Sequence, residues 1–407
     1  MKETQMRRKP FLLIILMIVA LSLLVGGCGG GAVQPPAAAI NFADPMLEAA
    51  VRNAAGYTGQ ATGPIYPTDV LGITVLNFNG PSIQAGRDGQ EDGDSGSSWE
   101  RLEHRLLLKE EERHRRLGER EAGNEPLTRG AGGLVSLEGI QHLTNLQVLS
   151  FDNNRVSDLT PLQNLTNLLD LSFWNNLVSN LTPLQNLTSL KYLNFNGNPV
   201  SSLTPLQNLT NLQYLGFNYN QVSSLTPLQY LTNLQRLYFA NNQVSSLTPL
   251  QNLTNLQSLD VSNNQVSSLT PLQNLTNLQL LYFSDNQVSN LTPLQNLANL
   301  QSLDFVHNQV NSLTPLQNLT SLQVLNFGYN QVSSLTPLQN LTNLKWLYFE
   351  HNHVSDITPL VNNAGIGDGD TVDMRYNYLD LNPWSIDFFN IQFLKSRGCT
   401  VFYNPQN

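Results

Sequence analysis

Apolar residues recur along most of this chain with a period of 22 residues. Each period contains the spacing L-x-x-L-x-F-x-x-N, usually with Phe in the third apolar place, as in the segment from Leu212 to Asn220. An unrelated low-complexity tract would not keep its apolar positions fixed while the positions between them vary, so the periods indicate true structural repeats. They open at Leu137, Leu159, Leu181, Leu203, Leu225, Leu247, Leu269, Leu291, Leu313 and Leu335, and a degenerate eleventh opens at Ile357.

The alternation inside each period predicts a short β-strand. Between Tyr214 and Asn218, the side chains of Leu215 and Phe217 would point inward and the others outward, because side chains alternate along a strand. One coil cannot bury its own apolar side. The coils are therefore expected to stack, with their strands forming a continuous parallel sheet.

Two polar features recur with the same period. An asparagine follows each strand, and we expect its amide to be buried, bonded to the backbone of the turn and repeated as a ladder. A Thr-Pro pair would cap and begin a short helical turn on the back of each coil. The asparagines stand at 154, 176, 198, 220, 242, 264, 286, 308, 330 and 352, and the prolines at 161, 183, 205, 227, 249, 271, 293, 315, 337 and 359.

Both ends of the array need caps, because a terminal coil would otherwise expose its core. Asp44, Pro45, an apolar stripe and Gly56 predict an N-terminal helix, and residues 73–78 predict the first strand. Near the other end the repeat strays over residues 357–377, and residues 383–397 then predict an amphipathic helix, followed by a last strand. The apolar stripe of that helix comprises Ile386, Phe389, Phe393 and Leu394.

Residues 84–134 do not follow the repeat. If they are removed, Ile83 joins Val135 and a full repeat unit is restored. The capping box of Ser97 and Glu100 and the mixed charges that follow predict an exposed helical or disordered protrusion. An acquired insertion tolerated on a loop is favoured over a dedicated docking arm.

The first 28 residues have the pattern of a targeting segment. Basic residues precede an apolar run from Phe11 to Val25, which is shorter than a membrane span of about 20 residues. The following Gly26-Gly27-Cys28 resembles the lipobox of bacterial lipoproteins, and the resemblance implies cleavage before Cys28 and a lipid on it. An uncleaved signal anchor and an ordinary secretory peptide are the alternatives. Cys399 then has no disulfide partner and is expected to be a small core residue.

The repeat spacing is the leucine-rich-repeat signature, and the 22-residue period resembles the internalin-like class of bacterial surface proteins over residues 41–407, apart from the insertion. The resemblance implies an α/β solenoid, a right-handed superhelix with a concave parallel sheet, short 3-10 or turn segments on the convex side, an N-terminal helical cap and a C-terminal helix-strand cap. We expect a signal peptide at 1–28, a linker at 29–40, the N-terminal cap and first strand at 41–83, the insertion at 84–134, repeats at 135–376 and the C-terminal cap at 377–407.

The resemblance also implies a non-catalytic, membrane-anchored protein of the cell envelope that presents its concave face to a protein partner. A glycan-binding envelope protein that uses concave Tyr and Trp residues is one alternative. A regulatory subunit of an intracellular enzyme is another, although a targeting segment contradicts it. We expect a monomer with the membrane as its second partner.

Outward strand positions are where recognition residues are expected, since the core does not select them. Tyrosine and tryptophan there bury a large area at modest entropic cost, and the same mixture suits stacking on sugars. The alternative is a purely structural rod with ordinary surface residues. The predicted ligand-binding residues are Trp174, Tyr192, Asn194, Tyr214, Arg236, Tyr238, Asp260, Tyr282, Asp304, Trp346, Tyr348 and Glu350.

Composition and motifs argue against other classes of function. Residues 137–356 hold only 4 Lys and Arg and 9 Asp and Glu, so they lack the basic stripe that nucleic acid requires. We find no nucleophile elbow, phosphate loop or zinc spacing, and we therefore expect no enzyme activity and no cofactor. Glu350-His351-Asn352-His353 is the best metal candidate, but Asn352 belongs to the ladder, so no metal site is expected.

Overall fold

The computed structural model describes residues 37–57, 63–77 and 133–406. The chain divides into two units, residues 1–38 and residues 39–407, and the first lies almost wholly outside the described residues. The predicted signal segment with Cys28, nearly all of the predicted linker and insertion, and Phe78 also fall outside them. Within the described residues, no helix is both long and apolar enough to cross a membrane.

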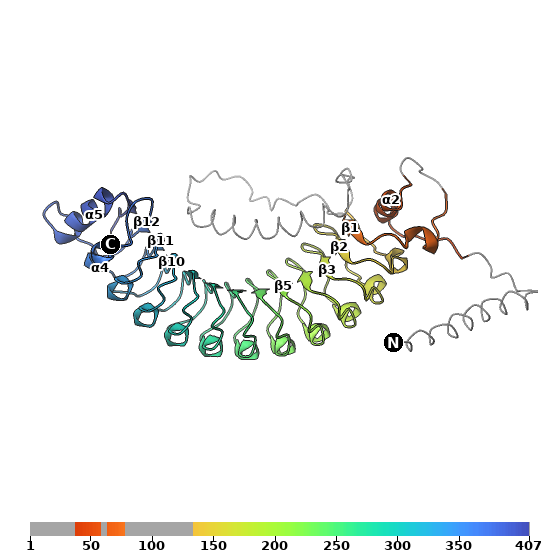
Figure 1. Ribbon diagram of the computed structural model, residues 1–407, viewed down its shortest axis with the longest axis horizontal. Helices are drawn as coiled ribbons and strands as arrows, with labels where there is room; N and C mark the ends of the chain where they lie inside the picture. Colours follow the sequence, from red (N-terminus) through yellow and green to blue (C-terminus); the bar gives the residue numbers. More distant parts are fainter. Residues whose placement is uncertain (1–36, 58–62, 78–132, 407) are drawn as a thin grey trace, which may run out of the picture. The chain divides into compact units, whose positions relative to one another are not determined.

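The repeats of the second unit form one parallel sheet of 13 strands whose order in space follows the chain. Neighbouring strands pair in register, so that Leu193 lies beside Leu215. Figure 1 shows the strands on the inner side of a curved row of coils and the helical turns on the outer side, which confirms the predicted solenoid. The strands are β1 (Val75–Asn77), β2 (Val148–Ser150), β3 (Asp170–Ser172), β4 (Tyr192–Asn194), β5 (Tyr214–Gly216), β6 (Arg236–Tyr238), β7 (Ser258–Asp260), β8 (Leu280–Tyr282), β9 (Ser302–Asp304), β10 (Val324–Asn326), β11 (Trp346–Tyr348), β12 (Thr371–Asp373) and β13 (Thr400–Phe402).

The Thr-Pro-Leu segments form single turns of 3-10 helix on the convex side. The predicted capping role of the threonine is wrong, because Thr204 is the first residue of its turn and its N–H donates to Ser202 Oγ at 3.3 Å. Proline has no N–H, so the threonine N–H is the donor that needs a partner. The Thr-Pro-Leu turns are η3 (Thr160–Leu162), η4 (Thr182–Leu184), η5 (Thr204–Leu206), η6 (Thr226–Leu228), η7 (Thr248–Leu250), η8 (Thr270–Leu272), η9 (Thr292–Leu294), η10 (Thr314–Leu316) and η11 (Thr336–Leu338), and two 3-10 turns of other sequence precede them, η1 (Pro67–Val70) and η2 (Ile140–His142).

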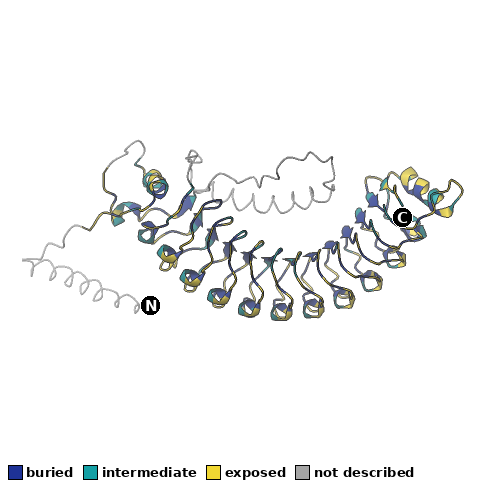
Figure 2. Ribbon diagram, turned by 180° about the vertical axis from the view of Figure 1, so that it is seen from behind, coloured by how far each residue is buried: buried dark blue, intermediate teal, exposed yellow. Residues whose placement is uncertain are grey.

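The core lies between the sheet and these turns (Figure 2) and consists of columns of identical side chains. Phe195 and Phe217 are 0% exposed and the repeat leucines 0–1%, and the two phenylalanine rings stack with centroids 5.7 Å apart. The phenylalanine column is broken at Val261, which takes the same position on its coil. Each fully buried side chain of this size contributes about 1.5–3 kcal/mol, so the stability of the array grows with each coil.

The asparagine ladder forms as predicted. Asn220 Oδ1 accepts the Val200 N–H at 3.1 Å, and Asn220 Nδ2 donates to the carbonyls of Phe217 at 3.0 Å and Phe195 at 3.2 Å. Each of these asparagines therefore joins its own coil to the preceding one. The row continues past Asn352 to Asn377, whose Oδ1 accepts the Val354 N–H at 3.0 Å.

The N-terminal cap contains helix α2 (Pro45–Ala54), which begins where the sequence predicts. Asp44 accepts the Met46 N–H at its start and also the Val135 N–H, both at 2.8 Å, so one side chain caps the helix and ties it to the first coil. Leu134, which the sequence assigned to the insertion, is fully buried, and its N–H donates to Asn154 Oδ1 at 2.8 Å. Leu134 therefore belongs to the repeat.

The C-terminal cap comprises α4 (Thr358–Asn362), β12, α5 (Ile386–Ser396) and β13. The predicted inward stripe of α5 is largely wrong, because Ile386, Phe389 and Phe393 are 72%, 54% and 49% exposed. The opposite face, with Asp387, Ile391 and Leu394, packs inward. Asp387 favours that orientation because its carboxylate accepts the Asp380 N–H at 3.1 Å. Cys399 is buried, as predicted.

Candidate binding surface on the sheet

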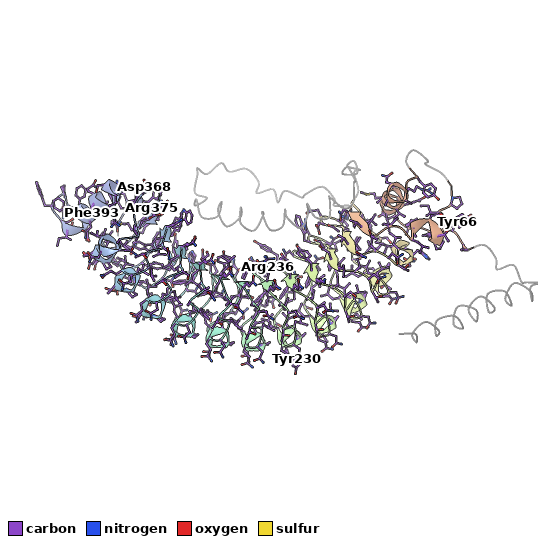
Figure 3. The ribbon with its side chains drawn as sticks, in the orientation of Figure 1. Tyr66, Tyr230, Arg236, Asp368, Arg375 and Phe393 are labelled. Carbon is purple, nitrogen blue, oxygen red and sulfur yellow. The ribbon has the colours of Figure 1, made fainter. Side chains whose placement is uncertain are left out.

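The outward strand positions lie on the inner side of the coils, where Figure 3 shows Arg236. Side chains on neighbouring strands cover one another to different extents, so the predicted binding residues fall into two groups. The exposed or half-buried group is Trp174, Arg236, Asp260, Trp346 and Glu350, and the buried group is Tyr192, Asn194, Tyr214, Tyr238, Tyr282, Asp304 and Tyr348.

Three tyrosines on β4, β5 and β6 form a first cluster. The rings of Tyr192 and Tyr214 stack with centroids 4.1 Å apart, and Tyr238 meets Tyr214 edge-on at 5.5 Å. The Tyr238 hydroxyl donates to Ser258 Oγ at 3.0 Å, and a side chain at Gly216 would crowd the Tyr214 hydroxyl at 3.1 Å. The rings therefore have few free faces.

A second cluster joins Tyr282, Val324 and Tyr348, with Leu280 and Trp346 packed against it. The three central residues are 3–5% exposed, so the accessible parts of this cluster are the half-buried side chains of Leu280 and Trp346. The sequence brings these residues together because β8 to β11 are adjacent in register.

Carboxyl groups accompany both clusters, and burial raises their pKa values. On β3 and the residues after β2, burial raises the pKa of Asp152 and of Asp170 to about 7, and the Asp152 charge contributes to the shift of Asp170. Asp152 accepts hydrogen bonds from the Ser172 hydroxyl at 2.6 Å and the Trp174 N–H at 2.9 Å. These two aspartates are not among the predicted site residues.

The second acidic group lies between β9 and β12. Burial raises the pKa of Asp304 to about 6, although Ser284 and Asn326 donate to its carboxylate. Burial raises the pKa of Glu350 to about 7. Glu350 Oε1 lies over Gly328, where an added Cβ would approach it to 2.7 Å, and its buried Oε2 has no hydrogen-bond partner within the described residues.

An aromatic column stands beside this acidic group and was not predicted. His307, Tyr329, His351 and Tyr376 come from four successive coils, and each ring stacks on the next with centroids 4.1 Å apart. Tyr329 is 42% exposed and His307 is exposed. Burial lowers the pKa of His351, as does the nearby His307 charge, and burial raises the pKa of Tyr329.

The column occupies a strained backbone position. The residue before each ladder asparagine has a positive φ, which lies between 52° and 55° at the four column residues. Asparagine, aspartate, histidine or glycine adopts this conformation at modest cost, whereas tyrosine does so rarely. Other coils use Asn153, Asn175, Gly197, Asn241, Asn263 and Asp285 at this place, apart from the coil with Tyr219, which has no aromatic neighbour in the row. That contrast is readable in the sequence and could have identified the column.

The described histidines do not form a metal centre with acidic neighbours. His351 stacks within the column, His353 lies against Tyr378 with ring centroids 5.6 Å apart, and Asn352 is held in the ladder. Within the described part of the chain, no group of three His, Cys, Asp or Glu side chains is placed to hold a metal ion.

Comparisons with known proteins agree on the fold. The family model "Leucine Rich repeats (2 copies)" matches residues 188–230, 232–274, 276–319 and 320–362. The solved structure of an internalin, inlF of Listeria monocytogenes, is 26% identical, with 92% of this chain and 95% of that chain covered and a TM-score of 0.71. A leucine-rich-repeat protein of Leptospira interrogans is 22% identical, with 69% and 78% covered and a TM-score of 0.59. A search of curated proteins gave no match.

Proposed function

We propose that this chain, an internalin-like leucine-rich-repeat protein, binds a protein partner through the concave face of its sheet at the bacterial cell surface. The leucine-rich-repeat solenoid is typical of protein-binding domains, and proteins of the internalin type are generally non-catalytic binding proteins. The contact would lie over β9 to β12, where the aromatic column, Trp346 and Glu350 are close in the sheet order.

The observation that carries the proposal is the aromatic column. Four adjacent coils place Tyr or His at a positive-φ position where the other coils, apart from the one with Tyr219, place Asn, Asp or Gly. At the two tyrosines of the column, backbone strain of this kind costs on the order of 1 kcal/mol per residue, and such strain gathers at functional sites. An aromatic row of two exposed and two half-buried rings on a rigid sheet loses little side-chain entropy on binding, which favours a role in recognition.

The same geometry favours a protein over a sugar at this face. In the column, and between Tyr192 and Tyr214, neighbouring rings already cover one another's faces at 4.1 Å. A sugar ring needs a free aromatic face, whereas a protein surface can accept hydrogen bonds from the tyrosine hydroxyls at the ring edges. The unpartnered Glu350 Oε2 would accept a donor from the partner, and a basic side chain suits it best.

A double variant tests the surface. Tyr329→Asn installs the residue that other coils carry, and Trp346→Ala removes the accessible indole, while Tyr230→Asn on the convex side is the matched control. We expect a partner protein to be cross-linked to the full-length chain and to the control, and to be purified with both. The same protein should not be recovered with the double variant. Equal recovery of that protein with all three chains would place its contact elsewhere.

The location is a separate proposal with its own test. We propose that Cys28 carries the lipid, because the apolar run and Gly26-Gly27 precede it. In bacteria fed labelled palmitate, the wild-type chain should be labelled in the membrane fraction and Cys28→Ser should not. An unlabelled wild-type chain in the cytoplasm would favour the regulatory subunit of an intracellular enzyme instead.

A further inference from the structure

The convex side carries a second regular row, formed by the two residues that follow each 3-10 turn. On η5 these are Gln207 and Asn208, which are both exposed. The row keeps the same amide pair on nearly every coil, although the strand positions across the core differ from coil to coil. Its glutamines are at 163, 185, 207, 229, 251, 273, 295, 317 and 339, and its asparagines at 164, 186, 208, 252, 274, 296, 318 and 340.

The fold does not explain these amides. Each turn is fixed by backbone bonds and by a short side-chain network, in which the Ser202 hydroxyl donates to Thr204 Oγ1 at 3.1 Å. A further asparagine, Asn211, donates to the Thr188 carbonyl at 2.9 Å. Among the side-chain hydrogen bonds of the described residues, none involves Gln207, Asn208 or their equivalents. Their donors and acceptors face solvent.

Successive turns leave a polar groove between them. One groove of about 310 Å³ lies between η4 and η5 and is lined by Thr182, Gln185, Asn186, Thr204, Gln207 and Asn208. The same residue types line a groove of about 320 Å³ between η7 and η8, and another of about 470 Å³ between η9 and η10. These volumes reach the lower part of the range of ligand sites, about 300–1,000 Å³.

Tyr230 interrupts the row at its centre. It replaces the asparagine after η6, which is the coil between the first two grooves, and its side chain is 68% exposed. Figure 3 shows Tyr230 on the outer side of the coils, away from the concave surface. In contrast to the concave tyrosines, this ring is exposed to solvent and is not part of the hydrophobic core.

We propose that the convex row binds a neutral polysaccharide, with Tyr230 stacking on one sugar ring and the amide grooves on both sides bonding to the hydroxyl groups of the polymer. Primary amides each offer donors and an acceptor, which match neighbouring sugar hydroxyls. The Thr-Pro-Leu-Gln segments hold no charged residue, so an anionic polymer would find no basic partner there.

The affinity of these grooves for a polymer would depend on their repetition along the row. One exposed amide exchanges a bond to water for a bond to sugar and gains little. A polymer that spans several grooves converts later contacts into intramolecular ones, so its avidity rises steeply with chain length. We therefore expect a long glucan to bind more than about tenfold more tightly than a trisaccharide of the same linkage.

Titration of the full-length chain with neutral glucans tests the proposal. The probes are a linear α-glucan and a linear β-glucan, each as a polymer and as a trisaccharide. Tyr230→Asn restores the residue of the other coils, so the turn should fold as they do. We expect it to weaken binding of the polymer by about tenfold, as loss of a central aromatic contact does.

Two further results would decide the matter. The Tyr329→Asn, Trp346→Ala double variant should bind the glucan as well as the wild type, which separates this surface from the proposed protein-binding face. Unchanged glucan affinity in Tyr230→Asn, or no binding of either polymer to the wild-type chain, would overturn the proposal and would leave the concave surface unaffected.

Discussion

Two neighbouring rows of side chains on the same coils differ in how strongly the fold determines their residue types. The ladder asparagines are identical on every coil, largely buried, and have both amide atoms bonded to the backbone. The two residues before each asparagine differ between coils and include a buried carboxylate oxygen without a partner and aromatic residues at positive φ. The ladder specifies the fold, whereas the row beside it departs from the most stable choice, as binding surfaces often do.

Removal of a ladder asparagine should have the largest effect. Asn220→Ala leaves the buried Val200 N–H without an acceptor and removes the donor to the Phe195 and Phe217 carbonyls. We expect a loss of about 3–5 kcal/mol, because orphaned buried groups cost about 1–3 kcal/mol each. Urea unfolding with amide hydrogen exchange at Val200 would measure it, since repeat arrays need not unfold in one step.

Asn211→Ala is the matched control. Its single bond to the Thr188 carbonyl at 2.9 Å is exposed to solvent, so its removal should cost only about 1 kcal/mol. An equal loss in the two variants would mean that the ladder is no more important than a surface bond, and the contrast between the two rows would fail.

The sequence predicts the regular parts of this molecule because one rule is repeated on each coil. Strand, ladder and turn follow from the alternation around Leu215 and Phe217 and from the asparagine after them, and the structure confirms them. Where the rule stops, the sequence is ambiguous. Ile386, Phe389 and Phe393 form an apolar stripe as regular as the one with Ile391 and Leu394, and contacts from outside the helix distinguish the two faces, among them the hydrogen bonds of Asp387 with the Asp380 N–H and of Asn390 with Thr358.

The candidate site is less predictable for a different reason. The outward direction of Tyr192 and Tyr214 follows from strand alternation, but their burial depends on how side chains of neighbouring coils pack together. A pattern within one repeat contains no information on that packing. The positive-φ row is readable in principle, because Tyr329 replaces the Asn or Gly of other coils, but its stacking is a property of several coils together.

Neutralising Glu350 should have an intermediate effect of opposite sign. Burial raises the pKa of its carboxyl to about 7 from an ordinary 4.5, so the folded state favours the protonated form. The stability from this group is present below about pH 4.5 and is lost as the pH rises through 7. Glu350→Gln should therefore stabilise the protein at pH 8 by on the order of 2 kcal/mol, since one pKa unit corresponds to about 1.4 kcal/mol and solvent screens part of the effect.

Urea midpoints of the two chains across pH would test the Glu350 prediction. The curves should converge near pH 4 and separate above pH 7. A constant offset at every pH would mean that the substitution acts through packing over Gly328 and not through the charge of the carboxylate.

The smallest effects on stability should come from substitutions in the row of positive-φ residues itself. Substitutions of two tyrosines in this row should change stability with different signs. Tyr219 is 66% exposed, so Tyr219→Asn should relieve strain and stabilise the protein by about 0.5–1 kcal/mol. Tyr329→Asn relieves the same strain but removes two ring stacks at 4.1 Å, each worth about 0.5–1.5 kcal/mol, so it should be neutral or destabilising. Urea midpoints measured side by side would compare them. If both variants were stabilised equally, the ring stacks would contribute nothing to folding stability. Binding alone would then explain the aromatic residues of the column.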